Sequence, residues 1–373
     1  MIIGVPREIK KLEHRVGLVP NSVVEFVRNG HEVWVESGAG AGINFSDEDY
    51  EAAGARIAET AEAVFDHAEM IIKVKEPQPQ EFKLLKPHHV LFTYLHLAAD
   101  RPQAIGLIES GCTAIAYETV TGGDGRGLPL LQPMSEIAGR LSVQVGAYHL
   151  QKHKGGEGRL IGGVPGVKPA KVLIIGGGVA GFHAAQMATG LGANVTILER
   201  NNERMRFLDE YFIGRANIVY SSTGALEEMA KNADLVIGSV LIPGASAPKL
   251  IRREMLSEMI PGSVFVDIAI DQGGCAETSR ATTHDDPTYV VDNVVHYCVA
   301  NMPGAVPLTS ALALNHSVLP YALQLANKGW KQALSYDLNF LEGLNVCNGK
   351  ITHRAVAEAL DMDLFPTASM LVA

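Results

Sequence analysis

Short apolar runs alternate with amphipathic stretches along most of the chain. In the first 120 residues the β-rich runs are IIGVP, HEVWVE, MIIKVKE, VLFTYLHLA and TAIAYETV. Segments in which apolar residues recur at helical spacing, such as 21–29 and 101–110, separate these runs. The alternation predicts a parallel sheet with helices on both faces. After residue 199 further strand-like runs follow, namely IVYSS, DLVIGSVL, SVFVDIAI and YVVDN, which indicate a second sheet of about six or more strands.

The second sheet is expected to start in the segment KVLIIGGGVAGFHAAQMATGLGANVTILE, residues 171–199. It reads as a strand, a glycine turn, a helix and another strand. Gly176, Gly178 and Gly181 occupy the glycine positions of a dinucleotide-binding turn, which allow a tight bend, a close approach of backbone to pyrophosphate and close helix–strand packing. Glu199 ends the second strand, where a carboxylate accepts hydrogen bonds from the ribose hydroxyls of NAD and repels a 2′-phosphate. We predict an NAD site, and the alternative is a Rossmann-shaped domain without a ligand.

Glycine and proline clusters divide the chain into domains. GGDGRG at 122–127 precedes Pro129 and Pro133, and a second break lies at Pro303 and Pro307. We expect Ser135 to cap a long helix that reaches about Lys154 and could bridge the domains. Another helix is expected over 309–326, kinked at Pro320, followed by a tail of helices and turns from residue 329 that folds back onto the first domain.

The predicted fold class is therefore α/β, with two Rossmann-like doubly wound domains. The NAD-binding domain, 129–306, is inserted in a discontinuous substrate domain, 1–128 and 307–373, and a cleft is expected between them.

Composition narrows the ligands. The formal charge is −10, and Lys and Arg form no runs, which argues against a nucleic-acid partner and favours small metabolites. The amino terminus does not resemble a signal peptide, and no stretch is long and apolar enough to span a membrane, so no membrane partner is expected. The four cysteines are far apart and form no CxxC pair, so we expect neither a zinc cluster nor a disulfide, and a reducing cytoplasm fits best: Cys112, Cys275, Cys298 and Cys347.

Polar residues that end apolar strands are the candidates for chemistry, because ligands of parallel sheets collect at the carboxyl ends of the strands. Lys75, His96 and Asp271 end such runs, and Arg15 lies in the loop after the first strand. Each has an ordinary alternative: Lys75, like Lys73, as a solvated lysine, His96 as a core histidine, Asp271 as a cap of the next turn, and Arg15 as a surface charge. Together, two cations, an imidazole and a carboxylate suit oxidation of an amino or hydroxy acid beside a nicotinamide.

Longer motifs add a family resemblance. MIIGVPREIK, EHRVGLVP, VESGAGAG, KVKEP, FTYLHLA, PMSEIAGR, GGVPGV, DIAIDQGG and YCVANMPGAVP resemble the alanine dehydrogenases, and together they span the chain. The resemblance implies reversible oxidative deamination of L-alanine by NAD, giving pyruvate, ammonium and NADH, in a homohexamer. We expect no metal, because the two cations can polarise the substrate. It implies His96 and Asp271 as catalytic residues and Arg15 and Lys75 as substrate ligands.

The same resemblance, together with the glycine turn, points to the residues that bind the cofactor. They are Ser135, Gly176, Gly178, Val179, Gly181, Glu199, Arg204, Ser221, Val240, Leu241, Ile268, Asp271, Arg280, Val299, Ala300, Asn301 and Met302. Family members often carry aspartate where this chain has Glu199, and we expect the preference for NAD to survive the longer carboxylate.

Other functions remain as alternatives. One is a nucleotide-binding subunit related to membrane transhydrogenase, which would need no amino-acid site, and another is a saccharopine- or opine-type amino-acid dehydrogenase. A ligand-free structural role is a third. The set Arg15, Lys75, His96 and Asp271 favours the free enzyme.

Overall fold

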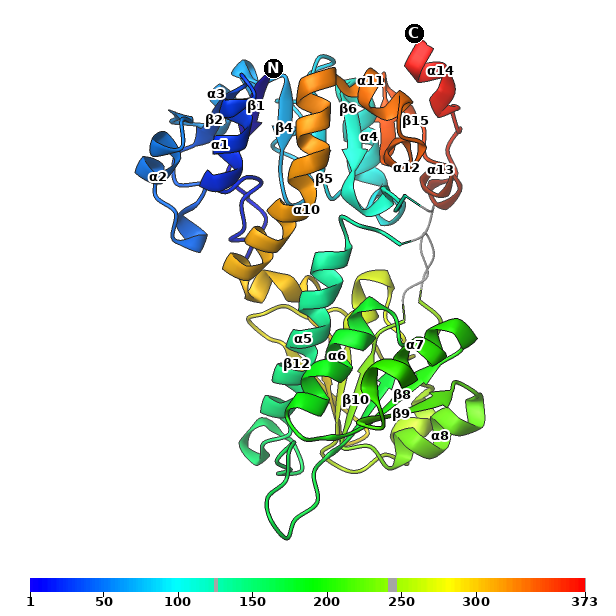
Figure 1. The fold of residues 1–373 in the computed structure, drawn as a ribbon. Coiled ribbons are helices and arrows are strands. Elements are labelled where there is room, and N and C mark those ends of the chain that lie inside the picture. Colours follow the sequence, from blue (N-terminus) through cyan, green and yellow to red (C-terminus); the bar gives the residue numbers. More distant parts are fainter. Residues whose placement is uncertain (124–126, 241–246, 373) are drawn as a thin grey trace. The chain divides into compact units, whose positions relative to one another are not determined.

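The computed structural model describes residues 1–123, 127–240 and 247–372, which form two compact units (Figure 1). Unit 1 comprises Met1–Pro133 and Val306–Ala373, and unit 2 comprises Met134–Ala305. The chain therefore enters unit 2 after Pro133 and returns to unit 1 at Val306.

Unit 1 contains an eight-stranded sheet in the order β15-β14-β6-β5-β4-β1-β2-β3. Six strands are parallel, and β14 and β15 add an antiparallel edge. The parallel strands run β3-β2-β1-β4-β5-β6, so the order reverses between β1 and β4 as in a doubly wound fold. The bounds are β1 (Ile2–Val5), β2 (Glu32–Glu36), β3 (Arg56–Ala58), β4 (Met70–Ile72), β5 (Val90–Thr93), β6 (Thr113–Ala116), β14 (Leu344–Cys347) and β15 (Lys350–Ile351).

The helices of unit 1 start and stop at local signals. In α4 (Arg101–Ser110) the Asp100 side chain accepts the N–H of Gln103, and Gly111 ends the helix at a φ of 69°. Pro320 lies inside the continuous helix α10 (Pro307–Lys328). The other helices are α1 (Pro20–Arg28), α2 (Asp47–Ala52), α3 (Ala61–His67), α11 (Trp330–Ser335), α12 (Leu338–Leu341), α13 (Arg354–Leu360) and α14 (Thr367–Val372), with 3₁₀ turns η1 (Ala41–Ile43), η2 (Leu97–Ala99) and η3 (Tyr117–Thr119).

Unit 2 contains a seven-stranded sheet in the order β12-β13-β11-β10-β7-β8-β9. All neighbours are parallel except β12 and β13. Every residue of β10, β11 and β13 is buried, as expected for strands covered on both faces. The bounds are β7 (Lys171–Ile175), β8 (Asn194–Glu199), β9 (Ala216–Tyr220), β10 (Leu235–Gly238), β11 (Val264–Asp267), β12 (Thr288–Val291) and β13 (Val294–Tyr297). The reversal between β7 and β10 repeats that of unit 1, and the prediction of two Rossmann-like domains is confirmed.

The predicted start and end of the long helix are wrong. Helix α5 (Gln132–His149) begins before Ser135, so Ser135 lies in its first turn and does not cap it. Pro133 causes no break there, because the first turn of a helix does not use its N–H groups. A separate turn, η4 (Lys152–Lys154), follows the helix. The remaining helical elements of unit 2 are α6 (Val179–Gly190), α7 (Asn202–Phe212), α8 (Thr223–Lys231), α9 (Arg253–Leu256), η5 (Ile268–Gln272) and η6 (Met302–Ala305).

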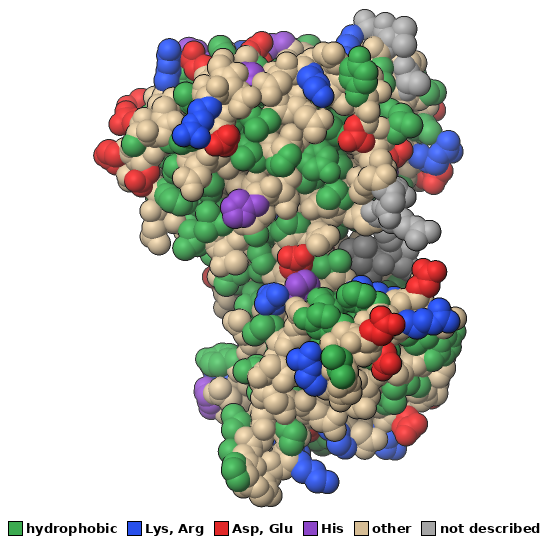
Figure 2. All heavy atoms as spheres, viewed as in Figure 1, with side chains coloured by type: hydrophobic (Ala, Val, Ile, Leu, Met, Phe, Trp, Pro, Cys, Tyr) green, Lys and Arg blue, Asp and Glu red, His purple; other side chains and the backbone are tan. Residues whose placement is uncertain are grey.

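Charged side chains of both signs are interspersed over the face of the molecule shown in Figure 2, which therefore presents no single basic field. Within the described ranges, no helix combines the length and apolar content needed to cross a bilayer.

Gly4 in β1 provides a test of the packing under the unit 1 sheet. A Cβ atom added there would lie 2.7 Å from the Cβ of Ala68 and 2.9 Å from methyl carbons of Val64 and Ile71. We predict that Gly4→Ala lowers the free energy of unfolding by about 1–3 kcal/mol, the usual cost of overpacking. Urea unfolding of Gly123→Ala is the control, because a Cβ at that position meets nothing within 4 Å. Equal midpoints for the two variants would contradict the packing described.

Candidate active site

The reversal of strand order in unit 1 brings two of the predicted residues to one edge of the sheet. Ligand sites in doubly wound sheets lie outside the carboxyl ends of the strands, where the order reverses. In unit 1 this switch point lies between β1 and β4. The loop after β1 carries Arg15, and Lys75 follows the end of β4.

Arg15 is buried in an ion pair with Glu13. The Nε atom of Arg15 donates to Glu13 Oε1 at 2.6 Å, and Nη2 donates to Oε2 at 2.5 Å. Burial lowers the pKa of Arg15, but the bonded carboxylate outweighs burial and the pKa rises. Arg15 is only 2% exposed, so its interpretation as a surface charge is wrong. The bidentate pair fixes the plane of the fork.

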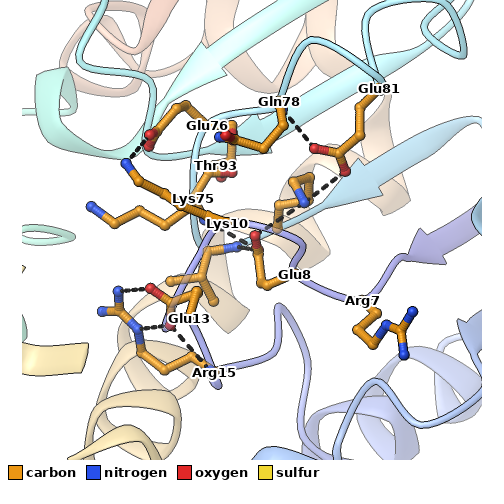
Figure 3. A network of polar contacts seen from close by, with 12 residues as sticks. Arg7, Glu8, Lys10, Glu13, Arg15, Lys75, Glu76, Gln78, Glu81 and Thr93 are labelled. Atoms are coloured by element: carbon orange, nitrogen blue, oxygen red, sulfur yellow. Dashed lines mark hydrogen bonds and ion pairs between the residues drawn. The ribbon is translucent and has the colours of Figure 1, made fainter. Parts of the chain in front are cut away.

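The backbone of Lys75 is held by two side chains. Its N–H donates to Glu8 Oε1 at 3.2 Å, and its C=O accepts from the hydroxyl of Thr93 at 2.9 Å (Figure 3). Lys75 itself is only 9% exposed, which rules out the interpretation as a solvated edge lysine.

Lys73 is not a solvated lysine either, because its side chain is fully buried between two carboxylates. The ammonium lies 3.1 Å from Glu8 Oε2 and 2.8 Å from Glu81 Oε1. Burial lowers the pKa of Lys73, but the two carboxylates outweigh burial and raise it. Burial also raises the pKa of Glu8, and Lys73 opposes that rise.

His96 follows β5, the neighbour of β4, and its backbone is left-handed with a φ of 52°. Glu118 Oε1 accepts the N–H of His96 at 2.6 Å, and the ring of Tyr94 lies parallel to the imidazole at 5.8 Å. The side chain is exposed, so the interpretation as a core histidine is wrong. A non-glycine residue in this conformation is strained and is held there by its surroundings.

In unit 2 the switch point lies between β7 and β10, and the glycine turn follows β7. Gly176 has a φ of 96°, and a Cβ on Gly181 would lie 1.8 Å from the carbonyl oxygen of Gly176. Ser239, after β10, donates to that carbonyl at 2.9 Å. A Cβ on Gly178 would meet nothing within 4 Å, so the backbone of Gly178 is open to a ligand at the amino end of α6.

Glu199 ends β8 and lies against the glycine turn. Its Oε2 accepts the N–H of Gly177 at 2.8 Å, and its Oε1 accepts that of Asn201 at 2.9 Å. Arg204 on α7 donates from Nε to the Gly177 carbonyl at 2.6 Å, and its guanidinium lies over the ring of Phe207 at 4.6 Å. Burial lowers the pKa of Arg204, and Glu199 opposes this shift. The carboxylate is thus placed beside the turn, as ribose recognition requires.

The other candidate cofactor residues mostly follow neighbouring strands at the same edge of the sheet. Ser221 follows β9, Val240 follows β10, Ile268 and Asp271 lie in η5 after β11, and residues 299–302 follow β13. Val179 is the first residue of α6 and Ser135 lies on α5, while the Arg280 guanidinium lies 4.0 Å from the centre of the Tyr289 ring. Leu241 lies outside the described residues. The glycine turn, the open helix end and the carboxylate fit a dinucleotide.

Asp271 is exposed in η5, and its Oδ1 accepts the N–H of Asn301 at 3.3 Å. The next turn does not depend on it, because the N–H groups of Gly273 and Gly274 donate to backbone carbonyls. The cap of η5 is Asp267, which is buried and accepts from the N–H of Ala269 at 3.1 Å. The interpretation of Asp271 as the cap of the next turn is therefore wrong.

Two further observations concern metals and cysteines. No group of three or more His, Cys, Asp or Glu in the described part of the chain is arranged to hold a metal ion. All four cysteines are free and buried.

Sequence reasoning did not identify the acidic residues that hold the site together. Glu8 and Glu13 lie in the loop after the first strand, and Glu118 follows β6. The rule that selected Lys75 and His96, a polar residue after an apolar strand, also applies to Glu118 in TAIAYETV and to Asp267 in SVFVDIAI. No feature of the sequence around Glu8 distinguished it from a surface glutamate.

Comparison with known proteins covers both units. Residues 4–138 match the alanine dehydrogenase/PNT N-terminal domain, and residues 142–354 match the C-terminal domain. The chain is 56% identical over 371 residues to alanine dehydrogenase of Halomonas elongata, with all of both chains covered.

Two solved structures are also similar. An L-alanine dehydrogenase superposes with a TM-score of 0.93 at 52% identity, covering 97% of this chain and 99% of the other. A transhydrogenase from Sinorhizobium meliloti gives 0.82 at 25% identity, covering 94% of this chain and 100% of the other. The chain belongs to the alanine dehydrogenase/PNT family.

Proposed function

We propose that this protein is an NAD-dependent L-alanine dehydrogenase, which converts L-alanine reversibly to pyruvate and ammonium. The proposal rests on the residues found where the strand order reverses in each sheet. In unit 1 these are the cations Arg15 and Lys75, and in unit 2 they are a glycine turn with Glu199 beside it. The full-length identity of 56% to an alanine dehydrogenase supports this substrate over the alternatives.

The two units take separate tasks in this proposal. Residues 1–128 and 307–373 form the substrate domain, and residues 129–306 bind NAD. Arg15 binds the alanine carboxylate, because a planar guanidinium matches a carboxylate. Lys75 adds a second cation for that carboxylate or for the developing carbonyl oxygen.

The cofactor residues form three groups. The turn at Gly176, Gly178, Val179 and Gly181 holds the pyrophosphate, since backbone N–H groups at a helix start favour an anion. Glu199 and Arg204 hold the adenosine side. The remaining contacts come from Ser135, Ser221, Val240, Leu241, Ile268, Asp271, Arg280, Val299, Ala300, Asn301 and Met302.

His96 and Asp271 manage protons and charge around the reacting carbon. NAD held at the glycine turn and Glu199 would supply the hydride acceptor for the α-carbon of alanine, which turns the amine into an iminium. His96 would take a proton from the water that adds to this iminium, and would take the remaining hydroxyl proton as the carbinolamine collapses to pyruvate and releases ammonia. Histidine suits this task because its ordinary pKa lies near neutrality. Asp271 positions the water or ammonia and balances the positive charge of the iminium. The two cations polarise the substrate, so the proposal requires no metal.

We also propose an oligomeric state and a cellular location for the protein. Resemblance to alanine dehydrogenases supports a homohexamer. The four free, buried cysteines support a reducing cytoplasm. We propose no nucleic-acid or membrane partner.

The direct test is formation of NADH when L-alanine is added to the purified protein and NAD with no other protein present. We expect saturable turnover with L-alanine and none with saccharopine or opines. A transhydrogenase-type subunit, the alternative to which the 25% identity points, would bind NAD but reduce none of it with alanine alone. Binding without turnover would overturn the proposal.

Cofactor choice is predicted to depend on Glu199. A 2′-phosphate beside this carboxylate would cost several kcal/mol, so we expect kcat/KM to favour NAD over NADP by about 10²-fold or more. Glu199→Gln should narrow the gap by improving NADP, because it removes the charge that repels the 2′-phosphate while its amide oxygen still accepts from the N–H partners of one of the two carboxylate oxygens. Glu203→Gln on α7 is the control and should leave the ratio unchanged. A parent protein that used both cofactors equally would exclude this role for Glu199.

His96 and Asp271 are predicted to act on chemistry and not on folding. His96→Asn should lower kcat by roughly 10²–10⁴, the usual contribution of general acid–base catalysis, while NAD still binds. Asp271→Asn keeps the size of the side chain and removes its charge, and a loss of similar order is expected. The control is Asp285→Asn, a change in the same unit. Near-normal kcat in Asp271→Asn, with unchanged circular dichroism, would remove Asp271 from the mechanism.

A further inference from the structure

The buried Lys73 ammonium joins two carboxylates that differ in what else they hold. Lys73 lies just after β4, and its side chain has no exposure. Glu8 comes from the loop after β1, and Glu81 from the segment after Lys75. Both carboxylates contact the same ammonium, at 3.1 and 2.8 Å. As counter-ions for Lys73, they are close to equivalent.

Glu8 makes a second set of bonds that Glu81 does not duplicate. Its Oε1 accepts the N–H of Val74 at 2.6 Å and the N–H of Lys75 at 3.2 Å, while Oε2 faces Lys73 (Figure 3). Glu81 directs its Oε2 to the N–H of Gln78 at 2.7 Å. The carboxylate of Glu8 thus accepts hydrogen bonds from the backbone that carries Lys75, whereas Glu81 accepts one from the backbone at Gln78.

Glu8 also lies in the same loop as Arg15. This loop and the end of β4 belong to neighbouring parallel strands, with Gly4 opposite Ile71. Beyond the last paired residues, the bonds of Glu8 to Val74 and Lys75 join the two segments that carry the cations. The hydroxyl of Thr93 fixes Lys75 from the other side, through its carbonyl.

We propose that Glu8 is a positioning residue that sets the place of Lys75 relative to Arg15, so that both cations contact the same substrate molecule. The inference rests on the proposed role of Lys75 as a substrate ligand. Glu8 acts through two backbone hydrogen bonds, and its charge serves to keep Lys73 buried.

Two conservative variants separate these tasks. Glu8→Asp keeps the charge but withdraws the acceptor by one methylene. We expect kcat/KM for alanine to fall by up to about 10²-fold, the effect of a misplacement of about 1 Å. Glu8→Gln removes the charge but keeps the length of the side chain, so its oxygen still reaches the N–H groups of Val74 and Lys75. This oxygen can accept from the two N–H groups, where it gains two bonds. The amide NH₂ then faces the Lys73 ammonium, which costs stability, while Lys73 keeps Glu81. Activity should stay within a few-fold of the parent.

The same changes at Glu81 are the matched controls. Glu81→Asp and Glu81→Gln disturb the same ammonium, so their melting temperatures should fall about as much as those of the Glu8 variants. Their kcat/KM for alanine should stay within a few-fold of the parent. The dissociation constant of NAD, measured by titration without alanine, should be unchanged in all four variants, because NAD is assigned to unit 2.

The outcomes decide between the possibilities. If Glu8→Gln loses as much activity as Glu8→Asp, an uncharged acceptor of the same reach does not suffice to position Lys75, and the inference is wrong. It is also wrong if the Glu81 variants lose as much, or if Glu8→Asp behaves like the parent. Lys75→Ala separates this failure from that of the proposed function. An active Lys75→Ala overturns the substrate role of Lys75, whereas an inactive one beside a fully active Glu8→Asp overturns only the positioning by Glu8.

Discussion

In each sheet the strand order reverses beside the first strand of the unit, between β1 and β4 and between β7 and β10. The chain connections that follow the two strands at a reversal point run to opposite sides of that point. The carboxyl ends of these two strands are therefore left open to a ligand. The strands on one side of these points, β4 and β5 in unit 1 and β10 and β11 in unit 2, are buried along their whole length. This topological constraint decides where polar chemistry can lie, and the candidate site of each unit is built at such a point.

Placing cations at the end of a buried sheet has an electrostatic consequence. An unpaired charge in such surroundings would lose several kcal/mol of hydration, so each cation needs a carboxylate within bonding distance. Glu13 forms an ion pair with Arg15, and Glu8 and Glu81 form ion pairs with Lys73. These pairs hold their side chains in fixed positions before a substrate arrives. The same acidic residues that permit burial of the cations therefore also orient them.

Local patterns in the sequence predicted most of the fold, and long-range pairing explains the rest. Helix α4 was predicted with its observed bounds from apolar residues at helical spacing over 101–110, and in the structure Asp100 and Gly111 mark its two ends. The strand β14 was missed because LNVC is only four residues long and forms a strand by pairing with β6, more than 200 residues earlier in the chain. The start of α5 was misplaced because Pro133 was taken as a break.

The candidate sites of the two units differ in how far a sequence reveals them. The candidate cofactor site of unit 2 is made largely of backbone groups, and it needs glycines at fixed spacing because Gly181 has no room for a Cβ. Such spacing is visible in the sequence alone. The candidate substrate site of unit 1 is made of side chains whose partners lie far apart, as Glu8 and Val74 are 66 residues apart. No local pattern separates Lys73, which is buried between two carboxylates, from a solvated lysine. Lys75 and Arg15 were selected only because of the strands that they follow. What distinguishes them physically is the set of acids around them, which only the folded chain brings together.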